Sequence, residues 1–580
     1  MDIFSEIRNI VIENLPEIAS SDSLIIDPSR ISVERPRDPT HGEIATNAAI
    51  LAAKSANRKP RELAEFVAEK LLSDDRIAAA DVAGPGFINL KLKEEAWLSV
   101  IPAILKSGAE FGRSTIGRNR RVCVEFVSAN PTGPLHVGHA RGAIFGDALS
   151  RLLEFVGFRV TREYYVNDGG AQVDSLARSV HLRYREANGF AVEFDANSYK
   201  GEYLGKLGRD LEAKYGEKFV DAPEHEWIGL FRGAAVGAMM ELIRKDLESL
   251  GIEMDVYFSE KSLYGTGIIE TTLNTLRERD LIYEGVLEQP KGKLIEDWEP
   301  RKQTLFRSTA HGDDVDRPIC KSDGSWTYFA PDIAYHYDKI KRGFDELVNI
   351  FGSDHSGYTK RMKAAVAALS DGRVAFDIKL IQMVRVMEDG RAATMSKRAG
   401  EFVQLREAIE AVGCDVARFV MLTRKNDAPL DFDFAAVKEK SKDNPVFYVQ
   451  YAHARICSVL RKAEQEGFDV SDTALASADL STLRHPFESA LVRRMAEWPR
   501  VVESAANSHE PHRIAYFLQN LASDLHGLWA QGNATASLRL LQRGEIATST
   551  AKLALVRSAA IVFSCGLGIL GVTPIQEMRS

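Results

Sequence analysis

The chain has 580 residues, of which 45% are hydrophobic, and its formal net charge is −8. This length is too great for one hydrophobic core and indicates several domains. The negative net charge gives no global sign of nucleic-acid binding, so any RNA contact must come from local basic patches.

The cysteines and the apolar segments narrow the class of protein further. The five cysteines are scattered and form no CxxC pair, which argues against a disulfide framework and a structural zinc site. Residues 1–15 have a helical period and do not resemble a signal peptide. The most apolar run, residues 559–572, is too short to span a bilayer and predicts a buried helix. We therefore expect a cytoplasmic protein with no membrane partner.

Residues 1–115 are expected to form a separate α+β module. Residues 43–72 have a mostly helical pattern, and a Gly-Pro-Gly turn precedes an alternating strand at residues 87–92. Phe87 and Asn89 are candidates for RNA contact, because an aromatic ring can stack on a base and an amide can bond its edge. Packing against neighbouring helices is an equally good explanation for Phe87.

Residues 116–425 contain the start of a parallel α/β sheet. Residues 122–127 are rich in β-branched side chains and predict a buried strand, which a run of turn formers follows. A helical pattern begins at His136, and residues 159–166 predict a second strand. A polar and helical insertion is expected at about residues 187–255.

The junction between this loop and helix has the features of a phosphate site. Pro134 suits a helix start, and Gly138 leaves the backbone open to a bulky ligand. His136 and His139 lie on one face of the first turn, where free N–H groups attract phosphate. We interpret them as catalytic imidazoles of a nucleotide site. The alternatives are two histidines that cap a surface helix, or a zinc pair that lacks a nearby third ligand.

Two later segments are expected to lie near this phosphate site, in the crevice at the carboxyl ends of the sheet strands. Gly352 and Asp354 follow a buried strand, where they can hold a ribose. After a further strand at residues 378–387 comes a short basic loop. Alone, this loop would be a solvated turn, but its place after a strand favours phosphate binding. Its residues are Met395, Ser396, Lys397 and Arg398.

Residues 426–580 are expected to form an all-α bundle, with helical structure from about residue 413. Asn444 and Pro445 predict a helix start. Tyr448, Tyr451 and Arg455 then share one helix face and can stack bases and contact phosphate. The alternative is that the tyrosines pack against neighbouring helices.

Several of these segments resemble one family. SANPTGPLHVGHARG and REYYVNDGGAQ resemble the class I aminoacyl-tRNA synthetase signature in its arginyl-tRNA synthetase version. GPGFINLKL, MSKR and DNPVFYVQYAHARI resemble the amino-terminal domain, lysine loop and anticodon-binding domain of that family. The resemblance implies a Rossmann-type class I catalytic domain between a module that binds the tRNA D-loop and a helical anticodon-binding bundle. Thr394 replaces the usual first lysine of the loop, which leaves Lys397 to meet the pyrophosphate.

The resemblance also implies an arginine–tRNA ligase that uses ATP, L-arginine and arginine tRNA. Mg²⁺ is expected with ATP, zinc is not, and the protein is expected to be a monomer. Carboxylates suit the fork of donors on a guanidinium. A structural ion pair is the alternative role for Glu125. By match to the family, the arginine pocket consists of Glu125, Ser128, Asn130, Tyr328, Asp332 and His355.

Three other functions stay open on this sequence. The first is a class I synthetase for another amino acid, which charging specificity would reveal. The second is a non-tRNA ligase or nucleotidyl transferase, whose activity would survive deletion of residues 443–580. The third is an inactive RNA-binding relative, which ATP turnover would exclude.

Overall fold

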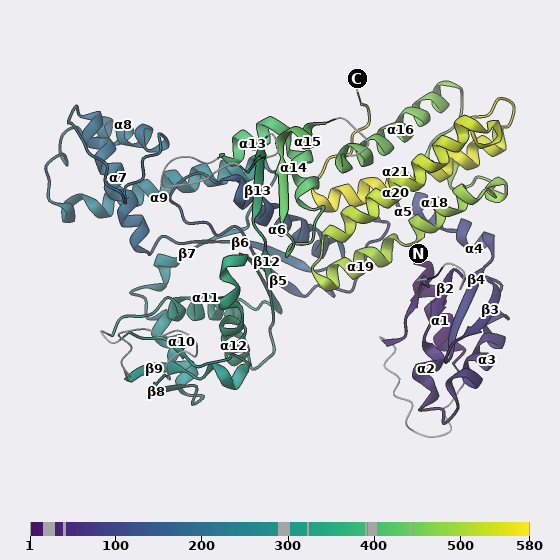
Figure 1. Ribbon diagram of the computed structural model, residues 1–580, viewed down its shortest axis with the longest axis horizontal. Coiled ribbons are helices and arrows are strands. Elements are labelled where there is room, and N and C mark those ends of the chain that lie inside the picture. The colour runs from purple at the N-terminus through teal and green to yellow at the C-terminus, as the bar shows by residue number, and fades with distance from the viewer. Residues whose placement is uncertain are drawn as a thin grey trace.

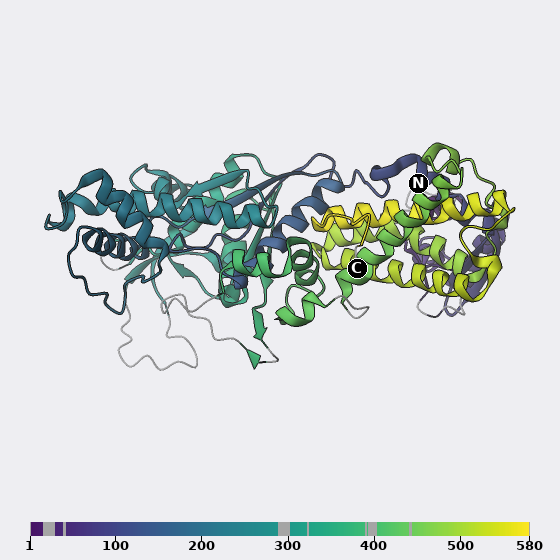
Figure 2. The same cartoon turned by 90° about the horizontal axis from the view of Figure 1, so that it is seen from above.

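The protein is elongated, with the helical bundle and the amino-terminal module at one end (Figures 1 and 2). The computed structural model describes residues 2–15, 30–36, 38, 42–287, 302–321, 324–388, 391–392, 403–439 and 444–578. The opposite end consists of three helices, α7 (Ala171–Ala187), α8 (Tyr203–Tyr215) and α9 (Glu224–Ser249).

The described strands of the amino-terminal module form an antiparallel sheet in the order β1-β2-β4-β3. The predicted strand at residues 87–92 is confirmed as β4. The helical pattern expected from residue 43 is wrong at its start, where Ile44–Thr46 is strand β2 and pairs with β4. The elements are α1 (Ile3–Glu13), β1 (Val33–Glu34), β2 (Ile44–Thr46), α2 (Ala48–Ala53), α3 (Pro60–Leu71), β3 (Ile77–Ala83) and β4 (Phe87–Leu92), followed by α4 (Glu94–Leu98) and α5 (Val100–Ser107).

The central domain contains the predicted parallel sheet, whose described strands run in the order β12-β11-β5-β6-β7. The chain proceeds from β5 through α6 to β6 in one direction, and from β11 through α12 to β12 in the other. Strand order therefore reverses between β5 and β11, and ligands bind at such a switch point. The elements are β5 (Arg121–Glu125), α6 (Val137–Phe155), β6 (Arg159–Val166), β7 (Val256–Ser259), α11 (Phe329–Lys341), β11 (Glu346–Gly352), α12 (Thr359–Ser370) and β12 (Ala375–Ile381).

Helices α7, α8 and α9 pack on one another around their own hydrophobic cluster, which includes Tyr184, Leu204 and Phe231. This unit begins at α7, before residue 187, because the apolar face of α7 is buried against α8 and α9 instead of the sheet. Another antiparallel sheet, absent from the sequence expectations, follows β7. It consists of β8 (Ile282–Val286), β9 (Lys302–Phe306) and β10 (Arg317–Pro318), next to α10 (Ile268–Arg277).

The strand expected at residues 378–387 is divided between two sheets. Strand β12 ends at Ile381, and β13 pairs with β14 and β15 in a separate sheet. Strand β15 also interrupts the helical structure expected from residue 413. These elements are β13 (Val384–Glu388), β14 (Arg391–Ala392), α13 (Leu405–Val412), α14 (Cys414–Met421), β15 (Leu430–Asp433) and α15 (Phe434–Lys438).

The carboxyl-terminal part is a helical bundle, as predicted. The Asn444 side chain caps α16 by accepting a hydrogen bond from the Val446 N–H, and Pro445 occupies the first turn. Helix α21 is long and apolar enough to cross a membrane, but 78% of its apolar window is buried, which identifies it as a core helix. The helices are α16 (Pro445–Gln465), α17 (Asp472–Leu475), α18 (Pro486–Ala496), α19 (Trp498–Ser508), α20 (His512–Ala534) and α21 (Ile546–Leu570).

Candidate active site

The turn after β5 has an unusual backbone. Val127 and Ser128 have φ angles of 69° and 40°, in the left-handed region that β-branched residues such as valine rarely adopt. The Ser128 hydroxyl holds this turn, because it donates to Glu125 Oε1 at 3.1 Å and accepts from the Tyr165 N–H at 3.1 Å. The strain lies at the carboxyl end of β5, beside the switch point of the sheet.

His136 and His139 are brought together at the amino terminus of α6. Their rings stack with centroids 3.7 Å apart, and the His136 N–H donates to His139 Nδ1 at 3.2 Å. A Cβ atom added to Gly138 would lie 2.8 Å from His136 Cε1. Gly138 therefore leaves room for the imidazole of His136, in addition to exposing the backbone.

The backbone of this junction is paired with the segment that follows the lysine loop. His136 and Gln404 form a β-bridge, and the Leu405 N–H donates to the Leu135 carbonyl at 2.9 Å. The Leu135 N–H donates to Asp246 of α9 at 2.9 Å. The predicted loop residues Met395, Ser396, Lys397 and Arg398 lie outside the described residues, but the chain resumes beside the two histidines.

Asp332, Glu260 and Glu125 interact electrostatically and form the acidic wall of the candidate arginine pocket. Desolvation raises the pKa of the Asp332 carboxyl to about 7, although the Tyr358 hydroxyl donates a hydrogen bond to it. The charges of Glu260 and Glu125 raise this pKa further. Desolvation and the charges of the same three carboxylates also raise the pKa of Tyr165. The charges of all three acids therefore act on one aromatic side chain, and carboxylates beside a ring suit a planar cation.

Glu260 is a candidate pocket residue that the sequence interpretation did not single out. It is 6% exposed, desolvation raises its pKa, and its Oε1 accepts from the Tyr264 hydroxyl at 3.0 Å. It directly follows β7, so it occupies the carboxyl end of a parallel strand like Glu125. The rule that ligands bind at these strand ends was the signal that could have found it.

Glu125 takes part in the ion pair that the sequence left open as an alternative. Its Oε2 accepts from the fully buried Lys339 Nζ at 2.6 Å, and Lys339 also reaches Asn349 Oδ1 at 3.3 Å. Among the described residues, neither Asp332 nor Glu260 forms an ion pair. These two acids are therefore the pocket carboxylates whose charge a ligand can still balance.

The other residues expected to contact small molecules have the following surroundings. The Asn130 side-chain amide donates to Gln172 Oε1 at 2.8 Å, and Tyr328 is 83% exposed. Gly352 ends β11, and a Cβ added there would lie 2.4 Å from Asp354 Oδ1. His355 lies against Asp354, with 3.6 Å between His355 Nε2 and Asp354 Oδ2. His355 thus belongs to the Gly352–Asp354 side of the crevice.

The two RNA-contact candidates on β4 have different environments. Phe87 is 42% exposed, so it is not a core residue as the alternative required. Asn89 lines a cavity of about 800 Å³ between the amino-terminal module and Arg493 of α18. Arg35 and Lys91 line the same cavity, together with the acids Glu43 and Asp81, so its wall carries charges of both signs.

The predicted stripe on α16 extends onto α20. The Arg455 guanidinium lies 4.7 Å from the ring centroid of Tyr451 and 4.3 Å from that of Trp529. The Tyr448 ring packs on His526 at 4.5 Å. Both tyrosines thus contact the neighbouring helix, because the Tyr451 ring also stacks on His526 at 5.7 Å, but Tyr451 stays 39% exposed. Trp529 and His526, three residues apart on α20, were not singled out in the sequence.

Comparison with known proteins agrees with this geometry. Residues 100–429 match the family model "tRNA synthetases class I (R), catalytic domain". Residues 5–92 match "Arginyl tRNA synthetase N terminal domain", and residues 449–578 match "DALR anticodon binding domain". The chain belongs to the arginyl-tRNA synthetase family. The predicted class I fold, with an amino-terminal module and a helical carboxyl-terminal domain, is thus confirmed.

Curated relatives of this synthetase family match over the full chain. The arginine–tRNA ligase of Ruegeria pomeroyi is 60% identical, and that of Paracoccus denitrificans is 61% identical. Each alignment covers 100% of this chain and 100% of the relative. The arginyl-tRNA synthetase of Thermus thermophilus has the same fold, with a TM-score of 0.73 at 20% identity over 99% of this chain and 100% of that one.

Proposed function

We propose that this synthetase activates L-arginine with ATP and transfers it to the 3′ end of arginine tRNA. The observation that carries the proposal is the set of interacting acids Asp332, Glu260 and Glu125, two of which stand at the carboxyl ends of β7 and β5, in the sheet whose β5–α6 connection carries the stacked histidines. We assign residues 1–115 to D-loop binding, 116–425 to catalysis and 426–580 to anticodon binding. The matched family ranges support this division.

In the first step, an oxygen of the arginine carboxylate attacks the α-phosphorus of ATP. The new P–O bond gives arginyl-adenylate, and the bond to the bridging oxygen breaks to release pyrophosphate. The imidazoles of His136 and His139 at the start of α6 donate to phosphate oxygens, and Lys397 with Arg398 neutralises the leaving group. Positioning and charge stabilisation supply most of the catalysis in such phosphate chemistry.

In the second step, a hydroxyl of the terminal tRNA ribose attacks the carbonyl carbon of the adenylate. The ester bond forms, the bond to phosphate breaks, and AMP leaves. Mg²⁺ is expected to arrive on the phosphates of ATP, because it prefers phosphate and carboxylate oxygens. Among the described residues, no group of three or more acidic, histidine or cysteine side chains could hold a metal ion, so no residue is assigned to it.

Arginine is selected by the charge and shape of its guanidinium. Asp332 and Glu260 provide acceptors on the pocket wall, while Glu125, already paired with Lys339, supports the pocket from the sheet. Ser128 fixes the turn, and Asn130 and Tyr328 provide polar groups at the rim. A site built to hydrogen-bond a polar substrate strongly rejects analogues that leave its groups unpaired. Lysine cannot form two parallel hydrogen bonds there.

Two regions are assigned to the tRNA. The exposed ring of Phe87 and the amide of Asn89 suit a looped-out base of the D-loop. Tyr451, Arg455 and Trp529 form a stacking surface for anticodon bases. We also propose that the protein acts in the cytoplasm as a monomer.

The test is aminoacylation of arginine tRNA by the full chain, with labelled arginine and labelled lysine in separate reactions. The proposal predicts acid-precipitable label with arginine alone, at a rate that depends on ATP. Charging with another amino acid would overturn the specificity, and ATP-independent or absent charging would overturn the activity.

A further inference from the structure

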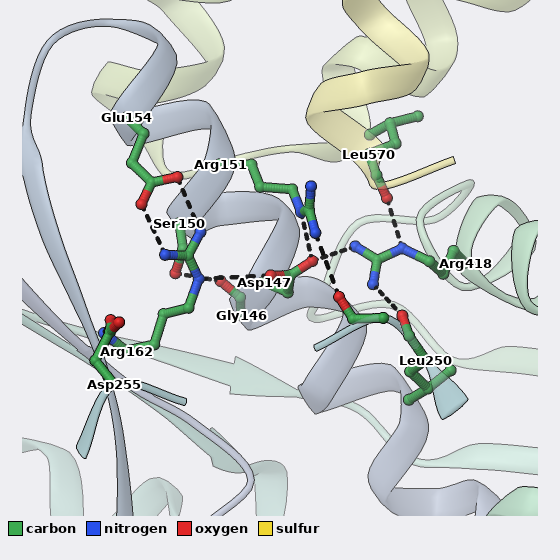
Figure 3. Close-up of polar contacts among 11 residues, drawn as sticks. Gly146, Asp147, Ser150, Arg151, Glu154, Arg162, Leu250, Asp255, Arg418 and Leu570 are labelled. Atoms are coloured by element: carbon green, nitrogen blue, oxygen red, sulfur yellow. Dashed lines mark hydrogen bonds and ion pairs between the residues drawn. The ribbon is translucent and has the colours of Figure 1, made fainter. Parts of the chain in front are cut away.

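A buried cluster of charges lies on the helix that carries the two histidines. Asp147 of α6 is 1% exposed and accepts from Arg151 Nε at 2.7 Å. Arg162 Nε of β6 lies 3.5 Å from Asp147 Oδ1, and Arg418 of α14 donates to Asp147 Oδ2, the oxygen that also accepts from Arg151 (Figure 3). Asp147 therefore joins α6 to two other elements of the chain, eight residues after His139.

Arg418 is the member of this cluster that reaches furthest. It is fully buried, and its guanidinium donates to the Leu570 carbonyl at 2.9 Å and to the Leu250 carbonyl at 2.8 Å (Figure 3). Leu570 is the last residue of α21, and Leu250 directly follows α9. One cation thus satisfies the free carbonyls at two helix ends, where the helix dipole favours positive charge.

The chain leaves no room for a side chain beside this guanidinium. Gly571 follows α21 with a φ angle of 68°, and a Cβ added there would lie 2.1 Å from Arg418 Nη2. Glycine at this position both ends the helix and allows the close approach of Arg418. The end of the bundle helix is therefore shaped to receive this one side chain.

The three helices that contact Arg418, namely α6, α9 and α21, belong to different parts of the enzyme. Helix α6 begins at the stacked histidines, and α9 holds the Leu135 N–H through Asp246. Helix α21 is the core helix of the bundle assigned to anticodon binding. Arg418 thus touches both the helix of the signature and the helix at the centre of the RNA-binding end.

We infer that Arg418, with Asp147, is a positioning residue that aligns the signature helix with the anticodon-binding bundle. This inference rests on the proposed function. In this positioning role, Arg418 contacts no substrate. It fixes the relation between the site where the tRNA is held and the site where its 3′ end must meet the adenylate. A planar guanidinium can serve a carboxylate and two carbonyls at once, which a lysine ammonium on a flexible stem does less well.

The bundle provides a matched control. Arg557 of α21 forms a bidentate pair with Asp472 of α17, with distances of 2.6 and 3.0 Å. This pair has the same chemistry and involves the helix whose last carbonyl Arg418 bonds, but it joins two helices within the bundle. Arg557→Met and Asp472→Asn therefore report what the loss of an arginine–aspartate pair does to the bundle alone.

The experiment compares aminoacylation kinetics of wild type, Arg418→Met, Arg418→Lys, Asp147→Asn and the Arg557→Met control. Melting temperature and tRNA dissociation constant, measured without ATP, accompany each variant. We expect Arg418→Met to lower the aminoacylation kcat by about 100-fold, because small misplacements of reacting groups cost that much. Its tRNA dissociation constant should stay within about 3-fold of that of Arg557→Met. Arg418→Lys should fall between Arg418→Met and wild type.

Asp147→Asn added to Arg418→Met should cause less further loss than Asp147→Asn alone, because both changes break the same interaction. Equal kcat values for Arg418→Met and Arg557→Met would overturn the inference. A fall in kcat that is proportional, across the variants, to the loss of tRNA affinity or to the drop in melting temperature would also overturn it. If Arg418→Met does not fold, the kcat values of Arg418→Lys and Asp147→Asn are compared with that of Arg557→Met in the same way, and equal values overturn the inference. Failure of the wild-type protein to charge tRNA would instead overturn the proposed function.

Discussion

The arginine pocket and the stacking surface on α16 and α20 use opposite physical means to bind their ligands. In the pocket, Asp332 and Glu260 are desolvated acids whose pKa values are raised. Binding of a cationic ligand is favoured because its positive charge stabilises their ionised forms. On the stacking surface, Arg455 lies between Tyr451 and Trp529, and Tyr451 stays 39% exposed. The comparison teaches that loss of one pocket group should be severe and specific for arginine, whereas loss of one stacking group should be mild and specific for tRNA.

The sharpest test of this contrast is Asp332→Asn. Removal of one partner from a buried charge pair leaves the other uncompensated, so we expect kcat/KM for arginine to fall on the order of 1,000-fold. The KM for tRNA should change little. Steady-state aminoacylation at varied arginine measures both. Asp338→Asn, on the same helix and paired with Arg342 at 2.9 Å, is the control. A fall in kcat/KM for arginine of less than about 10-fold, or an equal loss for arginine and for tRNA, would contradict the contrast between the pocket and the stacking surface.

Gly138→Ala tests the candidate phosphate site at the start of α6. The added Cβ would lie 2.8 Å from His136 Cε1, so the imidazole must move, and we expect kcat to fall about 100-fold. Gly142→Ala on the same helix is the matched control, because nothing lies within 4 Å of the added Cβ. Rates are measured by arginine-dependent ATP–pyrophosphate exchange with tRNA present. Equal rates for the two variants would show that His136 need not occupy its observed position.

The pocket should also respond to pH in a way that the stacking surface does not. The Asp332 pKa is raised to about 7 without ligand, and a bound guanidinium favours the ionised carboxylate. Arginine binding therefore releases a proton, and affinity should rise by about 10-fold from pH 6 to pH 8 before it levels off. Isothermal titration in buffers of different ionisation enthalpy measures both effects. Affinity that is flat over this range, or that falls, would contradict the raised pKa.

The smallest expected effect is that of Tyr451→Ala. Loss of one base–aromatic stack should raise the KM for tRNA by about 5- to 10-fold and leave the KM for arginine unchanged. Tyr516→Ala, also on the bundle surface at 43% exposure, serves as the control. An effect on arginine, or a tRNA effect no larger than that of Tyr516→Ala, would remove Tyr451 from the RNA surface.

The sequence predicted those parts of the molecule in which local chemistry determines structure. The β5–α6–β6 unit follows from a β-branched run, a proline-rich turn and Gly157, whose φ of 87° ends the helix region. Strand β2 was missed because its pairing with β4 supplies hydrogen bonds that a local pattern does not show. The bounds of helix α8 could not be read from the polar, glycine-containing part of the insertion, because its few buried residues pack in the cluster that it forms with α7 and α9.

The same distinction applies to the site. The histidines and Asp332 lie in recognisable motifs, but Glu260 and Arg418 do not. Glu260 matters because β7 ends beside the pocket, and Arg418 because two distant helix ends meet it. Both roles depend on tertiary neighbours far away in the chain. The pairing of Glu125 with Lys339 over 214 positions is a third example.

The most direct test of the central claim is ATP–pyrophosphate exchange with arginine, lysine and citrulline, each with and without arginine tRNA. The side chain of citrulline has nearly the shape of that of arginine but no positive charge. Citrulline therefore separates recognition of the side-chain charge from recognition of the side-chain shape. The account predicts exchange with arginine and neither of the others, and the resemblance to the family predicts that tRNA is needed. Exchange with citrulline at a rate close to that of arginine would contradict selection by the carboxylates of Asp332 and Glu260.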